Sequence, residues 1–365
     1  MIFEAKPLRT SEIPVTISSV DGCRLRTFHN IKYHSSQAVP DEIAKPERDF
    51  QVYEGFPLEI IEANDAFLPF GSKCLYDRQG VRINESCVRR CKDLAKLISA
   101  GSETISLPTD FITVDEPVVY LSWLQNHWGH FLTEGISRLW ALSQYPELKQ
   151  MLGAYCCYHL PHQNIRDFIE ALDFKIYIGG DRRNQAIRFR KVFIPFPSFA
   201  NQAKAYSVHR NAALKVVDAY LQEERPEVSD QPVFLSRSKV SSARTIGNQT
   251  ELERNLTRMG FLVVYPEELS LSSQINLFNH YHYFTGCWGS AFHTTILSRY
   301  PETIATHVLL DDTPNFDYLM FDSILGNEAN YIRAITPVPG EAQVWPNLNL
   351  AIDVDKAVTY FERLV

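Results

Sequence analysis

Hydrophobic and polar positions follow two different patterns along the chain, and the pattern changes near Pro117. Before this point, residues 1–115 carry short strand-like apolar runs broken by proline and glycine, with helical periodicity only around residues 85–100. After it, short apolar runs typical of buried strands alternate with segments of helical period. This alternation predicts βαβ units and therefore an α/β fold that follows an irregular, β-rich N-terminal segment.

The individual elements follow from these runs. Strands are expected at residues 118–123, 154–158, 175–178, 189–194, 233–236, 261–265, 281–285 and 304–310. Helices are expected at residues 127–146, 164–172, 207–223, 249–259, 271–279, from about 290, and at 353–364. At the helix near residue 250, Asn248 and Glu251 predict a capping box, and Gly260 predicts the end.

A polar segment with two prolines, residues 223–232, lacks any apolar period and is typical of a linker. The sequence therefore predicts a domain boundary there. The expected parts are an N-terminal domain at 1–225 (irregular at 1–115, βαβ at 116–225), a C-terminal domain at 226–340, and a tail with a helix at 341–365.

Composition narrows the class of protein. The chain has 365 residues, 45% of them hydrophobic, and a net charge of -7, which gives no electrostatic footprint for nucleic acid. Its seven cysteines form no Cys-x-x-Cys pair, so reduced thiols are expected. The N-terminus shows no signal-peptide pattern, and no apolar run approaches the ~20 residues that span a bilayer. The sequence thus predicts a cytoplasmic protein, with peripheral association with the inner membrane as an alternative.

Titratable side chains are concentrated directly after the first strand of the alternating region. On an ideal helix, His127, His130 and Glu134 fall within a sector of roughly 60°. They follow the carboxyl end of a strand, where open α/β sheets bind ligands. Because histidine titrates near neutral pH, His130 is a candidate general base, and Glu134 either orients its ring or is the base itself. Trp128 is a candidate platform for a sugar ring.

A second candidate site lies in the C-terminal half. Gly286 and Gly289 stand between a predicted strand and the helix expected near residue 290, where a backbone can approach a ligand closely and a helix start favours phosphate. Arg237, Lys239 and Arg244 follow another predicted strand and are expected at the same edge of the sheet. A guanidinium beside backbone amides suits a diphosphate leaving group.

Three segments together resemble glycosyltransferase family 61, in its bacterial-type members. They are residues 126–140, with the Asn-x3-His-x3-Glu pattern; residues 236–251, with a Ser-Arg stretch; and residues 265–291, ending in Gly-x-Trp-Gly-Ser-Ala. The similarity extends over about 118–310. It implies a GT-B architecture, in which two Rossmann-like βαβ domains face a cleft, and inversion at the anomeric carbon. Two departures are Gln249, where the family has glutamate, and Trp288, where it has histidine.

The resemblance implies a set of site residues. His130 and Glu134 are expected to be catalytic, and Asn126 and Trp128 to lie on the acceptor side. The nucleotide-sugar donor is expected to contact Arg237, Lys239, Arg244, Asn248, Glu251, Gly286, Trp288, Gly289, Ser290 and Ala291.

The resemblance implies a transferase that moves a sugar from a nucleoside-diphosphate sugar, most simply a UDP-sugar, to a hydroxyl of a saccharide, glycolipid or glycoprotein. No metal or other cofactor is expected, and the pathway expected is polysaccharide or glycolipid synthesis, such as that of a capsule. Two alternatives stay open. His127, His130 and Glu134 could be ligands of a zinc-dependent hydrolase, or the protein could be a non-catalytic nucleotide-sugar-binding subunit.

Overall fold

The computed structural model describes the chain in ranges separated by gaps. These ranges are residues 6–7, 24–25, 31–34, 51–54, 58, 60–89, 97–98, 101–157, 160–179, 185–221, 227–240, 244–311, 315–339 and 348–364. The contacts divide the chain into two compact units, Met1–Arg26 with Asp49–Ala219, and Thr27–Arg48 with Tyr220–Val365. The division falls near the linker expected at 223–232, but the second unit also takes residues 27–48, which the sequence grouped with the N-terminal part.

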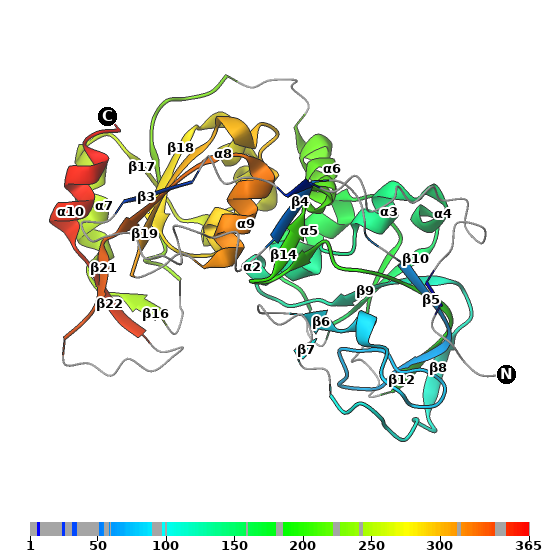
Figure 1. The fold of residues 1–365 in the computed structure, drawn as a ribbon. Helices are drawn as coiled ribbons and strands as arrows, with labels where there is room; N and C mark the ends of the chain where they lie inside the picture. The colour runs from blue at the N-terminus through cyan, green and yellow to red at the C-terminus, as the bar shows by residue number, and fades with distance from the viewer. Residues whose placement is uncertain are drawn as a thin grey trace. The chain divides into compact units, whose positions relative to one another are not determined.

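The first unit is built on a seven-stranded sheet (Figure 1). Its order is β1 (Lys6–Pro7), β5 (Ile60–Leu68), β12 (Ala186–Pro195), β9 (Val118–Trp123), β10 (Leu152–Cys156) and β11 (Ile176–Gly179), with β8 (Phe111–Val114) also paired to β12. Strands β8, β12, β9, β10 and β11 are parallel, whereas β5 pairs antiparallel with both β12 and β1. Apolar side chains of β5, β9, β10 and β12 form its core.

Smaller elements complete the first unit. A four-stranded sheet contains β13 (Phe199–Ala200), β14 (Lys204–Tyr206), β4 (Gln51–Glu54) and β2 (Arg24–Leu25), and a two-stranded sheet pairs β6 (Val88–Arg89) with β7 (Leu97–Ile98). The helices that follow the central strands are α4 (Pro146–Lys149), α5 (Gln163–Ala171) and α6 (Asn211–Tyr220), the last preceded by the 3-10 turn η5 (Ser207–Arg210).

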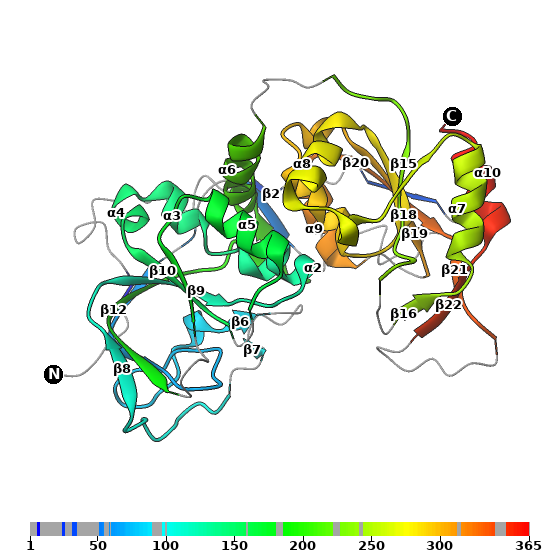
Figure 2. The same ribbon diagram turned by 180° about the vertical axis from the view of Figure 1, so that it is seen from behind.

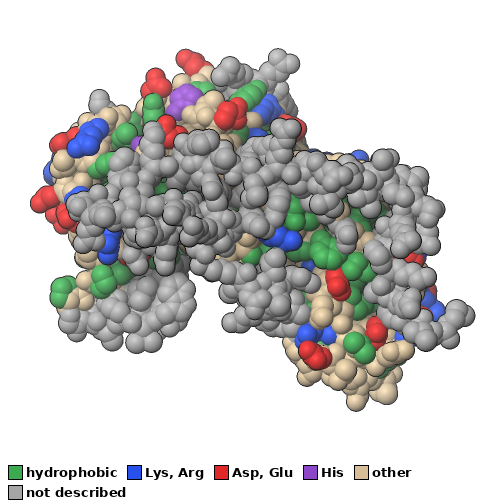
Figure 3. Space-filling view, viewed as in Figure 1, with side chains coloured by type: hydrophobic (Ala, Val, Ile, Leu, Met, Phe, Trp, Pro, Cys, Tyr) green, Lys and Arg blue, Asp and Glu red, His purple; other side chains and the backbone are tan. Residues whose placement is uncertain are grey.

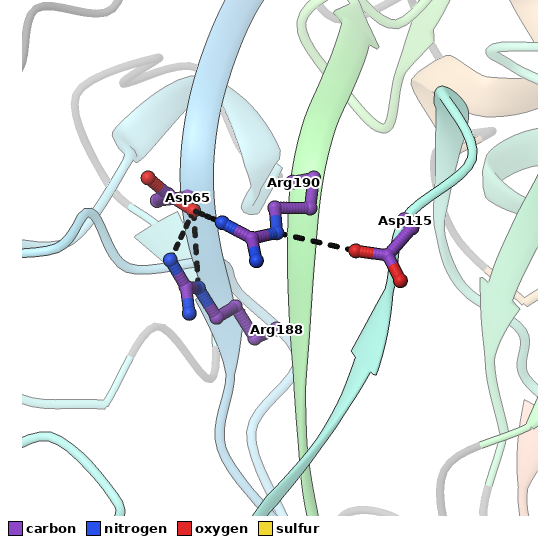
Figure 4. A network of polar contacts seen from close by, with 4 residues as sticks. All are labelled: Asp65, Asp115, Arg188 and Arg190. Carbon is purple, nitrogen blue, oxygen red and sulfur yellow. Dashed lines mark hydrogen bonds and ion pairs between the residues drawn. The ribbon is translucent and has the colours of Figure 1, made fainter.

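A polar network crosses the pair of strands β5 and β12 (Figure 4). Arg188 donates from Nε to Asp65 at 3.0 Å, and Arg190 donates from Nε to Asp115 at 3.2 Å. Asp65 has a positive φ of 54°, which aspartate tolerates better than most residues. Each guanidinium group is therefore matched by a carboxylate, and the network joins β12 to β5 and to the segment after β8.

The second unit contains a six-stranded, fully parallel sheet. Its order is β17 (Leu262–Val264), β15 (Val233–Leu235), β18 (Tyr283–Cys287), β19 (Ala305–Leu310), β20 (Glu328–Arg333) and β3 (Ile31–His34). Both views show α7 (Gln249–Arg258) and α10 (Val354–Phe361) on one face and α8 (Leu271–His280) and α9 (Phe316–Leu325) on the other (Figures 1 and 2). A three-stranded sheet of β16 (Arg244–Ile246), β22 (Leu348–Ile352) and β21 (Ile335–Pro337) completes the unit.

The structure confirms the α/β class and the strands expected after Pro117, but several local predictions are wrong. The described residues of 85–100, where the sequence has helical periodicity, form part of the 3-10 turn η3 (Asn84–Ser86) and strands β6 and β7, while residues 90–96 lie outside the described ranges. The capping box is also wrong: the Asn248 side chain makes no cap hydrogen bond, because it pairs with the backbone of Ile352 on β22. Gly260 does end α7, with φ of 94°.

Acidic and basic side chains are interspersed over the described surface shown in Figure 3. The cysteines of the described ranges are buried thiols, as the sequence predicted for reduced cysteines. Within the same ranges, every helix is too short or too polar to cross a lipid bilayer.

Candidate active site

The first candidate site begins where strand β9 ends. Ser122 adopts a positive φ of 84°, and the register between β9 and β10 shifts beside it, between Ala154 and Tyr155. Such an irregularity re-aims the residues that follow, and it is common next to active sites. Here the residues that follow are Trp123, Leu124 and Gln125.

The helix expected at 127–146 is broken into short pieces, so that prediction is wrong. It consists of α2 (Trp128–His130), a π-helical turn η4 (Phe131–Gly135), and, after an irregular turn, α3 (Trp140–Gln144). His127 caps α2 by accepting a hydrogen bond at Nδ1 from the backbone N–H of His130 at 3.3 Å. π-turns of this kind are frequent at functional sites.

Buried side chains from distant parts of the chain hold the π-turn in place. His209 Nε2 lies 2.8 Å from the carbonyl oxygen of Leu132, and its Nδ1 lies 2.9 Å from Ser198 Oγ. The Tyr155 hydroxyl donates to the carbonyl of Gly135 at 2.6 Å. Burial lowers the pKa of His209 to about 4, despite the opposing effect of the Leu132 carbonyl. His209 is therefore neutral, and because a carbonyl can only accept, its proton is on Nε2.

Arg138 links the same segment to the backbone of other parts of the first unit. Its side chain is buried, and it donates to the backbone carbonyls of Pro195, of Glu85 at 2.8 Å and of Cys87 at 3.3 Å. It therefore stabilises the framework behind the π-turn.

The π-turn brings the two predicted catalytic residues together. His130 Nδ1 lies 3.5 Å from Glu134 Oε2, and the side chain of His130 is 35% exposed while that of Glu134 is 5% exposed. Glu134 Oε2 also accepts a hydrogen bond from Gln125 Nε2. Gln125 was missed by the sequence analysis, although its place directly after β9 could have suggested it. The three side chains therefore form a linked series, from the amide of Gln125 through the buried carboxylate of Glu134 to the half-exposed imidazole of His130.

The neighbouring predicted residues lie at the same edge of the sheet. Asn126 Oδ1 accepts a hydrogen bond from the backbone N–H of His162 at 2.6 Å, which joins the segment after β9 to the segment after β10. Trp128 stacks on Phe131 with ring centroids 5.8 Å apart, and His127 lies 5.0 Å from His130 by the same measure. Among the described residues, no group of three or more His, Cys, Asp or Glu side chains is arranged to hold a metal ion. The zinc-site geometry suggested for His127, His130 and Glu134 is therefore not found.

The second candidate site lies at the carboxyl ends of β15, β17 and β18, which are parallel neighbours in the second unit. Arg237, two residues after β15, donates from Nη1 to the carbonyl of Trp288 at 2.6 Å. A Cβ atom at Gly289 would lie 3.3 Å from the same Nη1, and one at Gly286 would lie 2.7 Å from the Leu235 carbonyl oxygen. The structure therefore brings Arg237 and the glycine segment together, and the glycines permit this close approach.

The segment after β18 differs from the expected helix. Ser290 and Ala291 begin a 3-10 helix, η7 (Ser290–Leu297), and not an α-helix. Its β-branched run of Thr294, Thr295 and Ile296 is unfavourable for an α-helix. Burial raises the pKa of the adjacent Cys287 to about 12, so its thiol is neutral at physiological pH and is no nucleophile here.

The other residues predicted to bind the nucleotide-sugar donor have different surroundings. Lys239 pairs with Glu268 at 2.9 Å and lies over the ring of Tyr265, and this pairing raises its pKa. Arg244 begins β16 in the three-stranded sheet, and its side chain lies outside the described residues. Asn248 is engaged with Ile352, and Glu251 is exposed on α7.

A buried polar network underlies Arg237. Gln249 donates from Nε2 to Ser236 Oγ at 2.8 Å, Ser236 donates to Glu253 at 2.6 Å, and the Tyr265 hydroxyl donates to Glu253 at 3.2 Å. Gln249, one of the two departures from the family pattern, is thus a buried structural donor. Glutamate could not donate to Ser236 in the same way unless it were protonated.

Residues 128–305 match the family model of glycosyltransferase 61. The match begins at α2 and ends at the first residue of β19, so it contains His130 and Glu134 of the first candidate site and the whole of the second, but not Gln125 or Asn126. No curated protein sequence shows a significant match to the chain. The protein is therefore a glycosyltransferase with an α/β fold. It belongs to glycosyltransferase family 61, as the three motifs indicated.

Proposed function

We propose that the protein is an inverting glycosyltransferase that moves a sugar from a nucleoside-diphosphate sugar to an acceptor hydroxyl. The observation that carries this proposal is the contact of the Arg237 guanidinium with the carbonyl of Trp288, beside Gly289. It places a half-buried cation next to the first backbone amides of η7, at the carboxyl edge of a parallel sheet. Negative charge accumulates on the diphosphate as its bond to the sugar breaks, and such a group stabilises that charge.

The linked side chains of Gln125, Glu134 and His130 support the presence of a general base for the acceptor. In the proposed step, His130 takes the proton of the acceptor hydroxyl, the oxygen attacks the anomeric carbon, and the nucleoside diphosphate leaves with the bonding electron pair. Glu134 is buried and lies beside Nδ1 of His130. It is therefore suited to orient the ring and to stabilise the imidazolium that forms, while Gln125 holds the carboxylate.

The remaining parts of the proposal follow from the family resemblance. We propose a GT-B enzyme whose first unit supplies the base and whose second unit binds the donor, with a UDP-sugar as the first choice. Arg237 would neutralise the diphosphate, so the reaction would need no metal ion. The acceptor would be a saccharide, glycolipid or glycoprotein in polysaccharide or glycolipid synthesis, and the enzyme would act in the cytoplasm, with or without peripheral membrane association.

Calorimetric titration of UDP, GDP, CMP and dTDP into the full chain tests the donor. One of the diphosphates should bind, and the matching sugar nucleotide should then be consumed in the presence of acceptors, before and after treatment with a chelator. Binding without turnover of any donor would favour a non-catalytic nucleotide-sugar-binding subunit. No binding of any nucleotide would remove the donor proposal.

A further inference from the structure

Two cysteines of the first unit, Cys74 and Cys87, lie in contact with each other and away from solvent. Both are fully buried, and together they form a small cluster of their own. The chain between them makes a closed loop: the backbone N–H of Leu75 donates to Ser86 Oγ at 2.8 Å, and the N–H of Ile83 donates to the carbonyl of Leu75 at 2.8 Å. The two cysteines directly flank Leu75 and Ser86, so the closure of the loop brings their side chains together.

A hydrogen bond from the Cys74 thiol to the Cys87 sulfur makes the two groups chemically unequal. This bond and burial raise the pKa of Cys74. The same bond lowers the pKa of Cys87, and the nearby guanidinium groups of Arg82 and Arg138 lower it further, although burial opposes them. Cys87 therefore becomes a thiolate more readily than Cys74 does. Because a thiolate is the nucleophile of disulfide exchange, a thiolate with a second thiol beside it is suited to form a disulfide.

The pair lies in the framework that supports the first candidate site. Arg138, which follows the π-turn, donates to the backbone carbonyl of Cys87 at 3.3 Å. On the other side of the pair, the residue before Cys74 is Lys73, and its carbonyl accepts a hydrogen bond from the Tyr120 hydroxyl on β9 at 3.1 Å. A covalent bond between the two sulfurs would therefore join a segment bound to β9 with a segment bound to Arg138.

We propose that Cys74 and Cys87 are a modification site, at which a small disulfide of the glutathione class links them reversibly. In the first step, the Cys87 thiolate attacks a sulfur of the oxidant, which gives a mixed disulfide and releases one small thiolate. Cys74 then loses its proton and attacks the Cys87 sulfur, and the second small thiolate leaves. Two protein thiols are oxidised to one disulfide, and the oxidant is reduced to two thiols that take up the two protons. In a reducing cytoplasm the pair stays reduced, so the link forms under oxidising conditions.

Mass spectrometry of the full chain tests the linkage directly. The protein is equilibrated in buffers with rising ratios of oxidised to reduced glutathione, in urea below the unfolding transition, so that local opening gives the oxidant access to the buried thiols. Remaining thiols are alkylated in denaturant, and peptide mapping locates each bond. Cys74 and Cys87 should be the first of the seven cysteines to be joined within the chain. If both are alkylated at the most oxidising ratio, or if either is joined to a different cysteine instead, the proposal is overturned.

The linkage should also stabilise the first unit. A bond that closes a short loop removes conformational freedom from the unfolded chain, and for a loop of this length the melting temperature should rise by roughly 5–10 °C. Scanning calorimetry of the oxidised and the reduced protein measures this rise, which should disappear when dithiothreitol is added. A linkage without any rise in melting temperature would overturn its role in stabilising the framework. Neither measurement needs a substrate, so both are independent of the proposed function.

Three variants sharpen the result. Cys74→Ala and Cys87→Ala should each abolish the linkage and the rise in melting temperature on oxidation. The matched control is Cys287→Ala, which alters a buried cysteine of the second unit and should keep both. Each variant is compared with itself under oxidising and reducing conditions, so a loss of stability caused by the substitution cancels. A rise on oxidation that persisted in Cys74→Ala would contradict the assignment.

Discussion

The two candidate sites are held in place by different means. In the first unit, the buried side chains of His209 and Tyr155 bind backbone carbonyls of the motif segment. Arg138 of that segment donates to carbonyls elsewhere in the unit, and the carboxylate of Glu134 is itself buried. In the second unit, Arg237 lies half-buried at the ends of parallel strands, and its guanidinium contacts the glycine segment directly. The first site is an irregular turn stabilised from behind, and the second is an edge of a regular sheet.

The difference fits the chemistry proposed for each site. A general base must be placed to within a fraction of an ångström and kept in one orientation. The buried carboxylate of Glu134 and the hydrogen bonds to the π-turn can provide this placement. A diphosphate needs cations and amides that reach a bulky ligand, and strand ends with glycines supply this. Changes in the first site should therefore act on turnover, and changes in the second on donor affinity.

The largest effect is expected from His130. The His130→Ala variant should lower turnover by about 10²–10⁴-fold with little change in nucleotide affinity, because it removes the base and leaves the second unit untouched. Glu134→Gln should lower turnover as well, and the double variant should be no worse than about the poorer single variant, since the two act as one unit. Steady-state rates and calorimetry measure the two quantities. Wild-type turnover in His130→Ala would leave Glu134 as the sole candidate base.

The two units should also respond to acid in opposite directions. Burial lowers the pKa of His209 from 6.5 to about 4, so its contribution to stability is full above pH 6.5 and is lost as the pH falls towards 4. Burial raises the pKa of Asp322 in α9 from 3.8 to about 6, so its contribution is full below pH 3.8 and is lost as the pH rises through 6. Each shift corresponds to about 3 kcal/mol.

Hydrogen exchange followed by mass spectrometry, corrected for intrinsic rates, resolves the two units at pH 4.5 and 7. Protection of β9 and β12 should increase with pH relative to that of β19 and β20. The variants His209→Gln and Asp322→Asn should each flatten the response of their own unit only. A variant that changed the pH response of the other unit would contradict these assignments.

Arg237 should have a smaller effect than the base. Arg237→Ala should weaken binding of the nucleoside diphosphate by roughly 1.5–3 kcal/mol, the value of a charge-assisted hydrogen bond. The control is Arg258→Ala, an exposed residue of α7 whose guanidinium contacts Asn255 at 3.5 Å. Calorimetry with the diphosphate found in the donor screen compares the two. Equal affinity in both variants would remove Arg237 from the donor site.

Most of the regular structure after Pro117 could be predicted from the sequence, because each strand is a short apolar run with a clear boundary. The breaks within the expected elements could not be predicted. The continuous helix expected at 127–146 has the right apolar period, but its backbone is reshaped by His209 and Tyr155, which are distant in sequence. Local propensity carries no information about such partners. Strand β3, which joins the second unit from residues 31–34, is unpredictable for the same reason.

The candidate sites, too, could be predicted only in part. The pairing of His130 with Glu134 and the approach of Arg237 to Gly289 followed from spacing and from the parallel arrangement of strands. Gln125 was missed, since a glutamine in an irregular segment gives no pattern. Asn248 was read as a helix cap but binds Ile352, a residue about a hundred positions away.

The smallest effect is expected at Ser122, where β9 turns towards the first site. Its φ of 84° is unfavourable for serine, and its buried hydroxyl has no hydrogen-bond partner within the described residues. Ser122→Gly should therefore raise the free energy of unfolding by about 1 kcal/mol. Asp173→Gly, at an exposed turn with φ of 54° after α5, should be stabilising for the same backbone reason and is the control.

The two glycine variants should differ in activity. Ser122 directs the strand end that carries Gln125, so a more flexible backbone there should lower turnover modestly, whereas Asp173→Gly should leave turnover unchanged. Denaturant titration and steady-state rates give both quantities for each variant. If Ser122→Gly gained stability with full turnover, the positive φ would have no part in placing Gln125 against Glu134. The orientation of the carboxylate would then have to come from the pinned π-turn alone.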